Sequence, residues 1–170
     1  FSMEGKSVQQ DVDFEFDINV VFTDSDKEWA TEQLRRNIEE QLPQFERIAF
    51  GDDDLPLGMY YLDAIFYVIE HSFKTVLILS KAATLDHDFM MKLRTALNHV
   101  TNTRTQCTLL IFLEDIPDAE LPHLVKLYLS EERPYIYWDE DERGQKYFWK
   151  KVVKYLTVLN RRCNDMIPPE

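Results

Sequence analysis

Five short apolar runs recur along the chain, and segments with apolar residues at helical spacing lie between them. The runs are rich in β-branched and aromatic residues, which favour strands. They span residues 16–23, 47–50, 74–80, 107–113 and 135–138. The centre of the first run, 18–22, is typical of a strand buried on both faces. Strands that alternate with helices predict a parallel sheet.

Most of the intervening segments predict helices with one apolar face. The first has an apolar stripe at four-residue spacing, formed by Ala30, Leu34, Ile38 and Leu42, and Pro43 ends it. Weaker or shorter patterns predict helices at about 88–100, 121–129 and 144–159. The helix expected to begin near Met59 differs, because it is apolar nearly all round. Such a helix is usually buried on more than one side.

These elements predict a single three-layer α/β domain over residues 14–160. Five strands fit a parallel sheet of flavodoxin-like order 2-1-3-4-5, with right-handed crossovers and helices on both faces. Residues 1–13 are polar and lack periodicity, so we interpret them as a linker or the edge of an excised piece. Residues 161–170 contain two adjacent prolines and are expected to form a flexible tail.

The segment from Gly51 to Gly58 is the most informative loop. It joins the second strand to the helix near Met59, so it is expected to lie over the carboxyl edge of the sheet. Three aspartates (Asp52, Asp53 and Asp54) stand beside Leu55, Pro56 and Leu57. Leucines on a charged loop suggest a surface that a partner covers. The alternative is that they fold back on their own helix as a hydrophobic staple.

Charge and composition exclude several classes of ligand. The net charge of −12 argues against DNA, RNA and anionic lipid, because each needs a basic patch. The basic residues near the end of the chain recur at helical spacing, which favours a solvated helix face over a binding patch. The two cysteines and four histidines form no disulfide framework or metal-ligand spacing, which predicts a reduced intracellular compartment and no metal site. No apolar run approaches the roughly 20 residues of a membrane helix.

Several elements together resemble a Toll/interleukin-1 receptor (TIR) domain of the Toll-like receptor type. The elements are Phe16-Asp17 in the first strand (family box 1), Trp29, the loop 54–58 (box 2, the BB loop), the strand 74–80, the segment 113–117, and Phe148-Trp149 in the last helix (box 3). The resemblance covers roughly residues 16–159. Two positions in box 2 depart from the family pattern. Asp53 stands where an arginine is usual, and Pro56 lies one place early.

The resemblance implies an intracellular signalling module that binds rather than catalyses. Its partners would be a TIR-domain adaptor or a second copy of itself. The BB loop, Asp52 to Gly58, would form the contact, and Phe148 and Trp149 would be structural. It implies a cytoplasmic location, no cofactor, and a membrane connection only through a parent transmembrane segment. A soluble adaptor remains the alternative to a receptor tail, and the departures in box 2 suggest an unusual partner.

Two enzymatic readings stay open. Some TIR domains cleave NAD with a glutamate on the third helix, which can stabilise a developing oxocarbenium charge. Here Lys92 or Leu93 aligns with that glutamate, and Asp86 and Asp88 are expected to cap the helix. A response regulator would need an aspartate at the end of the third strand, where this chain has Ser80. We therefore expect no catalytic residues.

Overall fold

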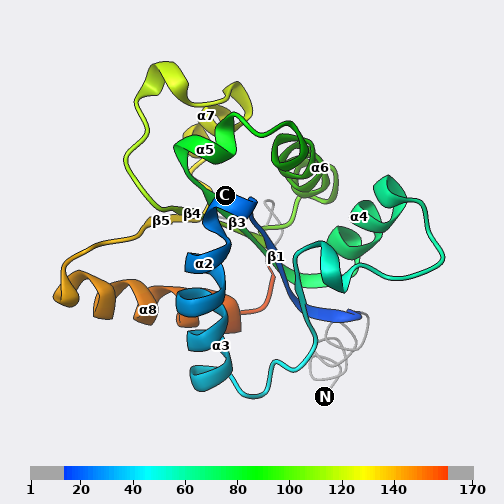
Figure 1. Ribbon diagram of the computed structural model, residues 1–170, viewed down its shortest axis with the longest axis horizontal. Helices are drawn as coiled ribbons and strands as arrows, with labels where there is room; N and C mark the ends of the chain where they lie inside the picture. The colour runs from blue at the N-terminus through cyan, green and yellow to red at the C-terminus, as the bar shows by residue number, and fades with distance from the viewer. Residues whose placement is uncertain (1–13, 161–170) are drawn as a thin grey trace, which may run out of the picture.

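The computed structural model describes residues 14–160, which are built around a five-stranded parallel sheet (Figure 1). The strands are β1 (Phe16–Val21), β2 (Ile48–Phe50), β3 (Ser72–Leu79), β4 (Thr108–Phe112) and β5 (Tyr135–Tyr137). Their order is β2-β1-β3-β4-β5, and every neighbouring pair is parallel. The predicted fold class, strand number and strand order are confirmed. The expectations for residues 1–13 and 161–170 fall outside the described part of the chain.

The helices alternate with the strands as expected. They are α2 (Lys27–Trp29), which continues through the π-helical segment η2 (Ala30–Arg35) into α3 (Arg36–Gln41), then α4 (Tyr61–Glu70), α5 (Lys81–Thr84), α6 (His87–Thr103), α7 (His123–Ser130) and α8 (Glu142–Thr157). Three short 3-10 turns complete the order: η1 (Asp24–Asp26), η3 (Asp52–Asp54) and η4 (Asp118–Glu120). Pro43 follows the end of α3 closely, as predicted.

Two separate apolar clusters cover the two faces of the sheet. One cluster joins the sheet to α4, α5, α6 and α7, with Leu77 and Leu93 fully buried in it. The other joins it to the η2–α3 rod and α8 (Figure 1). The predicted stripe of Ala30, Leu34, Ile38 and Leu42 lies in this second cluster and is buried. Burial on both sides explains why β3 reads as an unbroken apolar run.

Aromatic rings join the last residue of α2 to α8. Phe148 is fully buried, and its ring lies 4.8 Å from Trp149 and 5.0 Å from Trp138, measured between centroids. The half-buried Trp29 stacks on Trp149 at 6.3 Å. Such contacts add to the stabilisation from burial alone. Phe148 and Trp149 therefore pack within an aromatic cluster that connects α8 to Trp29 and Trp138.

Helix α4 corrects the prediction of burial on more than one side. Only one of its faces is buried, by Ala64, Ile65, Val68 and Ile69 against β1, β3 and α6. Outside this buried face the helix carries Leu62 and Phe66, which are 62% and 47% exposed. The prediction failed because apolar composition does not reveal whether a second layer covers the outer face of a helix.

Lys74 is a charged residue inside the sheet. It lies on β3 with its ammonium 4.4 Å from the ring centre of Tyr155 and 2.6 Å from Oδ1 of Asn160. Burial lowers the pKa of Lys74 from its usual 10.5 to about 8, although the nearby Cys107 thiol opposes this change. Between these two pH values the unfolded chain holds a proton that the folded chain has lost. Raising the pH through this window therefore favours the folded state.

We predict that Lys74→Met is more stable than the parent at pH 7 and that its advantage shrinks steadily toward pH 9.5. Urea unfolding of both proteins at several pH values measures this difference. The Cys107 thiol, whose pKa burial raises, acts in the same direction in this comparison, because Lys74 partly offsets that rise in the parent and is missing in the variant. A difference in unfolding free energy that is constant with pH would contradict the lowered pKa of Lys74.

Candidate docking site at the carboxyl edge of the sheet

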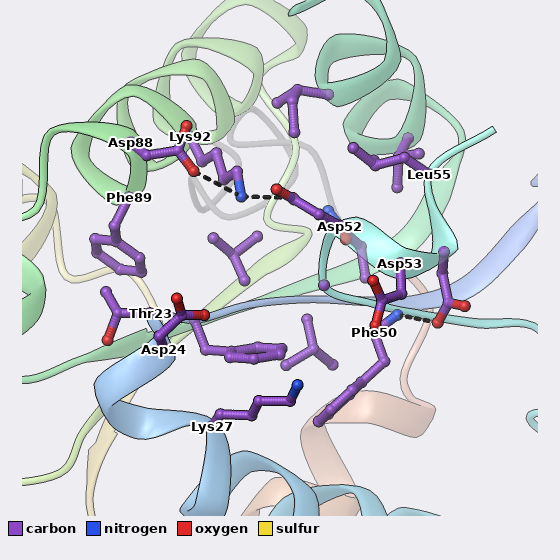
Figure 2. A pocket seen from close by; sticks show the side chains of 18 of the residues that line it. Thr23, Asp24, Lys27, Phe50, Asp52, Asp53, Leu55, Asp88, Phe89 and Lys92 are labelled. Carbon is purple, nitrogen blue, oxygen red and sulfur yellow. Dashed lines mark hydrogen bonds and ion pairs between the residues drawn. The ribbon is translucent and has the colours of Figure 1, made fainter. Parts of the chain in front are cut away.

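The loop after β2 borders a cavity of about 670 Å³ at the carboxyl edge of the sheet (Figure 2). The ends of β1 and β2, the first turn of α2, η3 and the start of α6 surround it. Carboxylates dominate the charged side chains of the lining, with Lys27, Arg35 and Lys92 as the cations. This is the position that the fold class predicts for a functional surface.

The first half of the loop has a defined shape that depends on Gly51 and Asp54. Gly51 has φ of 79°, and a Cβ atom there would come within 2.9 Å of the Phe22 ring, so glycine is required. Oδ2 of Asp54 accepts a hydrogen bond of 2.8 Å from the backbone N–H of Phe50. Asp54 therefore closes the η3 turn onto the end of β2, a structural role that composition alone did not indicate.

Asp52 connects the loop to helix α6 through Lys92. The ammonium of Lys92 lies 2.7 Å from Oδ1 of Asp52 and 3.1 Å from Oδ2 of Asp88. The hydroxyl of Tyr61 lies 2.9 Å from Oδ2 of Asp52 and 2.9 Å from Oδ2 of Asp88, and it donates to one of them at a time. Figure 2 shows Lys92 reaching from α6 toward Asp52 across the top of the cavity. Four side chains from three segments thus form one network.

The pKa values of Tyr61 and Lys92 are both shifted in this network. Burial raises the pKa of Tyr61 to about 12; the lysine opposes this rise, and the hydrogen bonds with Asp52 and Asp88 add to it. Burial alone would lower the pKa of Lys92, but its hydrogen bonds with Asp52, Tyr61 and Asp88 outweigh that effect and raise it. Lys92 is therefore charged and Tyr61 is protonated throughout the physiological range.

The two loop leucines have different environments. Leu55 is half-buried and packs against the core cluster beneath α4 and α6, which is the staple-like alternative. Leu57 is 97% exposed, and Gly58 next to it has φ of 83° with open space around its Cα. Pro56 between the leucines is half-buried. The loop thus anchors itself with one leucine and presents the other to solvent.

The exposed apolar residues extend beyond the predicted loop. Leu57, Met59 and Tyr60 precede α4, and Leu62 and Phe66 follow one turn apart on its outer face. We call these five residues the loop–α4 surface. Leu62 and Phe66 are visible in the sequence, but the apolar composition of their helix predicts that it is buried on more than one side. Their exposure adds a helix face to the candidate site.

The first family box lies at the other end of β1. Oδ1 of Asp17 pairs with the guanidinium of Arg47 at 3.0 Å, and Oδ2 accepts from the backbone N–H of Arg47 at 3.0 Å. Phe16 is half-buried beside it at the start of β1. These contacts fix β1 to the entry of β2. Phe16 and Asp17 are therefore structural supports and do not join the loop.

A model of the TIR domain family matches residues 18–166 of the chain. The chain belongs to the TIR domain family. Two curated relatives agree with this assignment. The TIR domain is 25% identical to Toll-like receptor 2 type-2 of Gallus gallus over 139 residues, and 22% identical to Toll-like receptor 4 of Felis catus over 151 residues. These alignments cover 81% and 88% of the chain but only 18% of each relative.

Solved structures share the fold at low sequence identity. The TIR domain of the Toll-related receptor TRR-2 of Hydra magnipapillata aligns with a TM-score of 0.65 and 17% identity, over 84% of this chain and 99% of that one. A TIR-STING receptor from C. gigas, solved in complex with 2',3'-cGAMP, aligns with a TM-score of 0.62 and 15% identity, over 86% of this chain and 40% of that one. Both confirm the architecture of this TIR domain.

The positions aligned with a catalytic glutamate have distinct environments in this TIR domain. Leu93 is buried in the core, whereas Lys92 faces the cavity. Asp86 caps α6 by accepting from the backbone N–H of Phe89 at 2.8 Å, as predicted. Asp88 was expected to cap as well, but its carboxylate pairs with Lys92 one turn further along α6. Within residues 14–160, no three metal-ligating side chains are grouped to hold an ion.

We predict that Asp54→Ala destabilises this TIR domain by about 1–2 kcal/mol, because the Phe50 N–H loses its acceptor. Urea unfolding monitored by tryptophan fluorescence measures the change. Asp53→Ala is the matched control, since it removes the neighbouring carboxylate, for which no hydrogen bond or ion pair occurs among the described residues. Equal effects of the two substitutions would contradict the structural role of Asp54.

Proposed function

We propose that this TIR domain is an intracellular signalling module that binds other TIR domains downstream of a Toll-like innate immune receptor. The partner is a cytosolic adaptor or a second copy of the chain. Asp52 to Gly58 and the outer face of α4 form the contact. The observation that carries the proposal is the exposure of Leu57 at the tip of a loop whose flanks are anchored.

The energetics favour a docking role for the loop–α4 surface. Fully burying a leucine or phenylalanine side chain contributes about 1.5–3 kcal/mol. Leu57, Tyr60, Leu62 and Phe66 leave much of that free energy unused in the monomer. Apolar side chains at the centre and charged groups at the rim are the usual anatomy of an interface. Asp53 and Asp63 are exposed beside these residues and supply such a rim.

The charge of the rim predicts the chemistry of the partner. Asp53 stands where the family resemblance places an arginine, so the loop has the opposite sign of charge at that position. A complementary partner presents lysine or arginine around an apolar patch. The association is then weakened by salt, because exposed charges are screened within about 8 Å at physiological ionic strength.

The proposal also covers the longer protein of which this domain would be a part. The matched Toll-like receptors are more than five times longer than the aligned segment, and none of the described helices is long and apolar enough to cross a membrane. We propose that the module works at the cytosolic face of a membrane receptor. Clustering of receptors would raise its local concentration, so individually weak contacts between TIR domains would become effective.

We predict that Leu57→Asp and Pro56→His each reduce partner binding at least tenfold. The first replaces the exposed apolar centre by a charge, and the second changes the loop shape that proline restricts. Co-precipitation with candidate TIR adaptors and with a second, differently tagged copy measures the effect. Circular dichroism and thermal unfolding should change little, since the Leu57 side chain makes almost no contact in the monomer.

Leu85→Asp is the matched control for this experiment. Leu85 is 82% exposed and follows α5, outside the loop–α4 surface. It therefore receives the same chemical change at a site not assigned to docking. Undiminished binding by Leu57→Asp and Pro56→His would overturn the proposed contact. Equal loss in the Leu85→Asp control would show that an added charge weakens binding wherever it is placed.

The rival function is NAD cleavage in the cavity beside the loop. An ammonium at position 92 opposes the positive charge that develops on the ribose in such a reaction. The two nearest carboxylates, Asp52 and Asp88, are already paired with it. We predict that the purified domain leaves NAD intact, both in solution and when tethered at high density on vesicles. If chromatography detects NAD cleavage, and Asp88→Asn abolishes it, the domain is an NAD-cleaving enzyme instead.

A further inference from the structure

Lys92 joins the two ends of the exposed part of the loop. The ammonium bonds to Asp52, which precedes the exposed residues, and shares Asp88 and Asp52 with the hydroxyl of Tyr61, which follows them. The Lys92 side chain is only 10% exposed, whereas its two carboxylate partners are about half exposed. A single buried cation therefore organises three more accessible groups.

The segment between these ends has little internal support. Among the described residues, no hydrogen bond engages residues 56–59, and the one at Tyr60 is its carbonyl accepting from Ala64 N–H in the first turn of α4. Leu57, Gly58 and Met59 are exposed and do not belong to either core cluster. We call residues 56–60 the arch. The shape of the arch therefore depends on how its two ends are fixed. Leu55 packs on the core at the near end, and Lys92 connects the two ends, directly to Asp52 and through the carboxylates of Asp52 and Asp88 to Tyr61.

We propose that Lys92 is a positioning residue that latches the loop to α6 and gives the arch of residues 56–60 its docking shape before any partner arrives. This inference rests on the proposed function, because it explains how that surface is held ready. Pre-organisation raises affinity by removing the cost of ordering the loop on binding. Lys92 acts through Asp52 and Tyr61 and does not need to touch the partner.

The sign of the charge at position 92 is essential to this device. A carboxylate there would face Asp52 and Asp88 and repel both, whereas a neutral side chain would leave the two carboxylates close together without a cation between them. Because Lys92 stays charged at neutral pH, the latch is closed under ordinary conditions. It would open through substitution of its members or through competition by high salt.

Three variants test the latch. Lys92→Met removes the charge but keeps an unbranched apolar stem, and Lys92→Glu reverses the charge. The double variant Asp52→Lys with Lys92→Glu moves the cation to the loop, where Lys at 52 can pair with Glu at 92 and with Asp88. Lys126→Glu on α7 is the matched control, because Lys126 is an exposed lysine with no ion pair in the described part of the chain.

The first measurement is the backbone order parameter from nitrogen-15 relaxation, which needs no partner. The order parameters of residues 57–60 should be high in the parent, fall below about 0.6 in both single variants, and return to the parent's values in the double variant. Residues 114–117, in the loop after β4, serve as an internal reference that should not change. A purely structural role for Lys92 would lower the unfolding temperature while leaving the order of residues 57–60 unchanged, and that result would overturn the latch.

The second measurement is binding to a second copy of the chain immobilised on a biosensor. Both single variants should weaken binding roughly tenfold, and the double variant should restore most of it. Failure of the parent to bind a second copy, together with loss of order in the single variants, would count against self-association and leave the latch supported. Full binding by single variants with a disordered arch would contradict the link between the latch and docking.

Discussion

The need to cover both faces of a parallel sheet sets the rest of this structure. The central strands β3 and β4 are buried along their whole length, so helices must return over both faces of the sheet, and the apolar stripes of those helices pack into the core. Leu34 and Phe148 on one face and Leu77 and Leu93 on the other are fully buried. Chemical variation is then confined to the loops at the edges of the sheet. The loop after β2 is one of these.

At that edge the loop divides its residues between support and presentation. Asp54 closes the turn onto β2, Leu55 packs on the core, and Asp52 reaches across to Lys92 on α6. Leu57 is left in solvent, together with the outer face of α4. The run of aspartates that reads as one acidic rim therefore contains residues with three different roles. The same arrangement directs the ammonium of Lys92 toward the cavity beside the loop.

The proposed docking function and the proposed latch follow from this division of roles. A surface with exposed apolar residues is useful for recognition only if its shape is stable, and residues 56–59 contribute no hydrogen bonds of their own within the described chain. Contacts on both sides of the exposed residues supply that stability: Leu55 and Asp52 hold the loop before them, and Tyr61 holds it after them. The departures from the family pattern, Asp53 and Pro56, lie within the same short segment, and it is the carboxylate of Asp53 on which the proposal of a basic partner rests.

The sequence by itself determined the elements, their order and the two-sided burial of the sheet. Apolar periodicity is a local property, so the stripe from Ala30 to Leu42 and the strand 74–80 could be read directly. Only the tertiary structure decided that the outer face of α4 is uncovered, that Leu55 turns inward while Leu57 does not, and that Asp52 pairs with Lys92. The last contact joins residues 40 positions apart. Its existence depends on how α6 packs beside the loop, which no local pattern records.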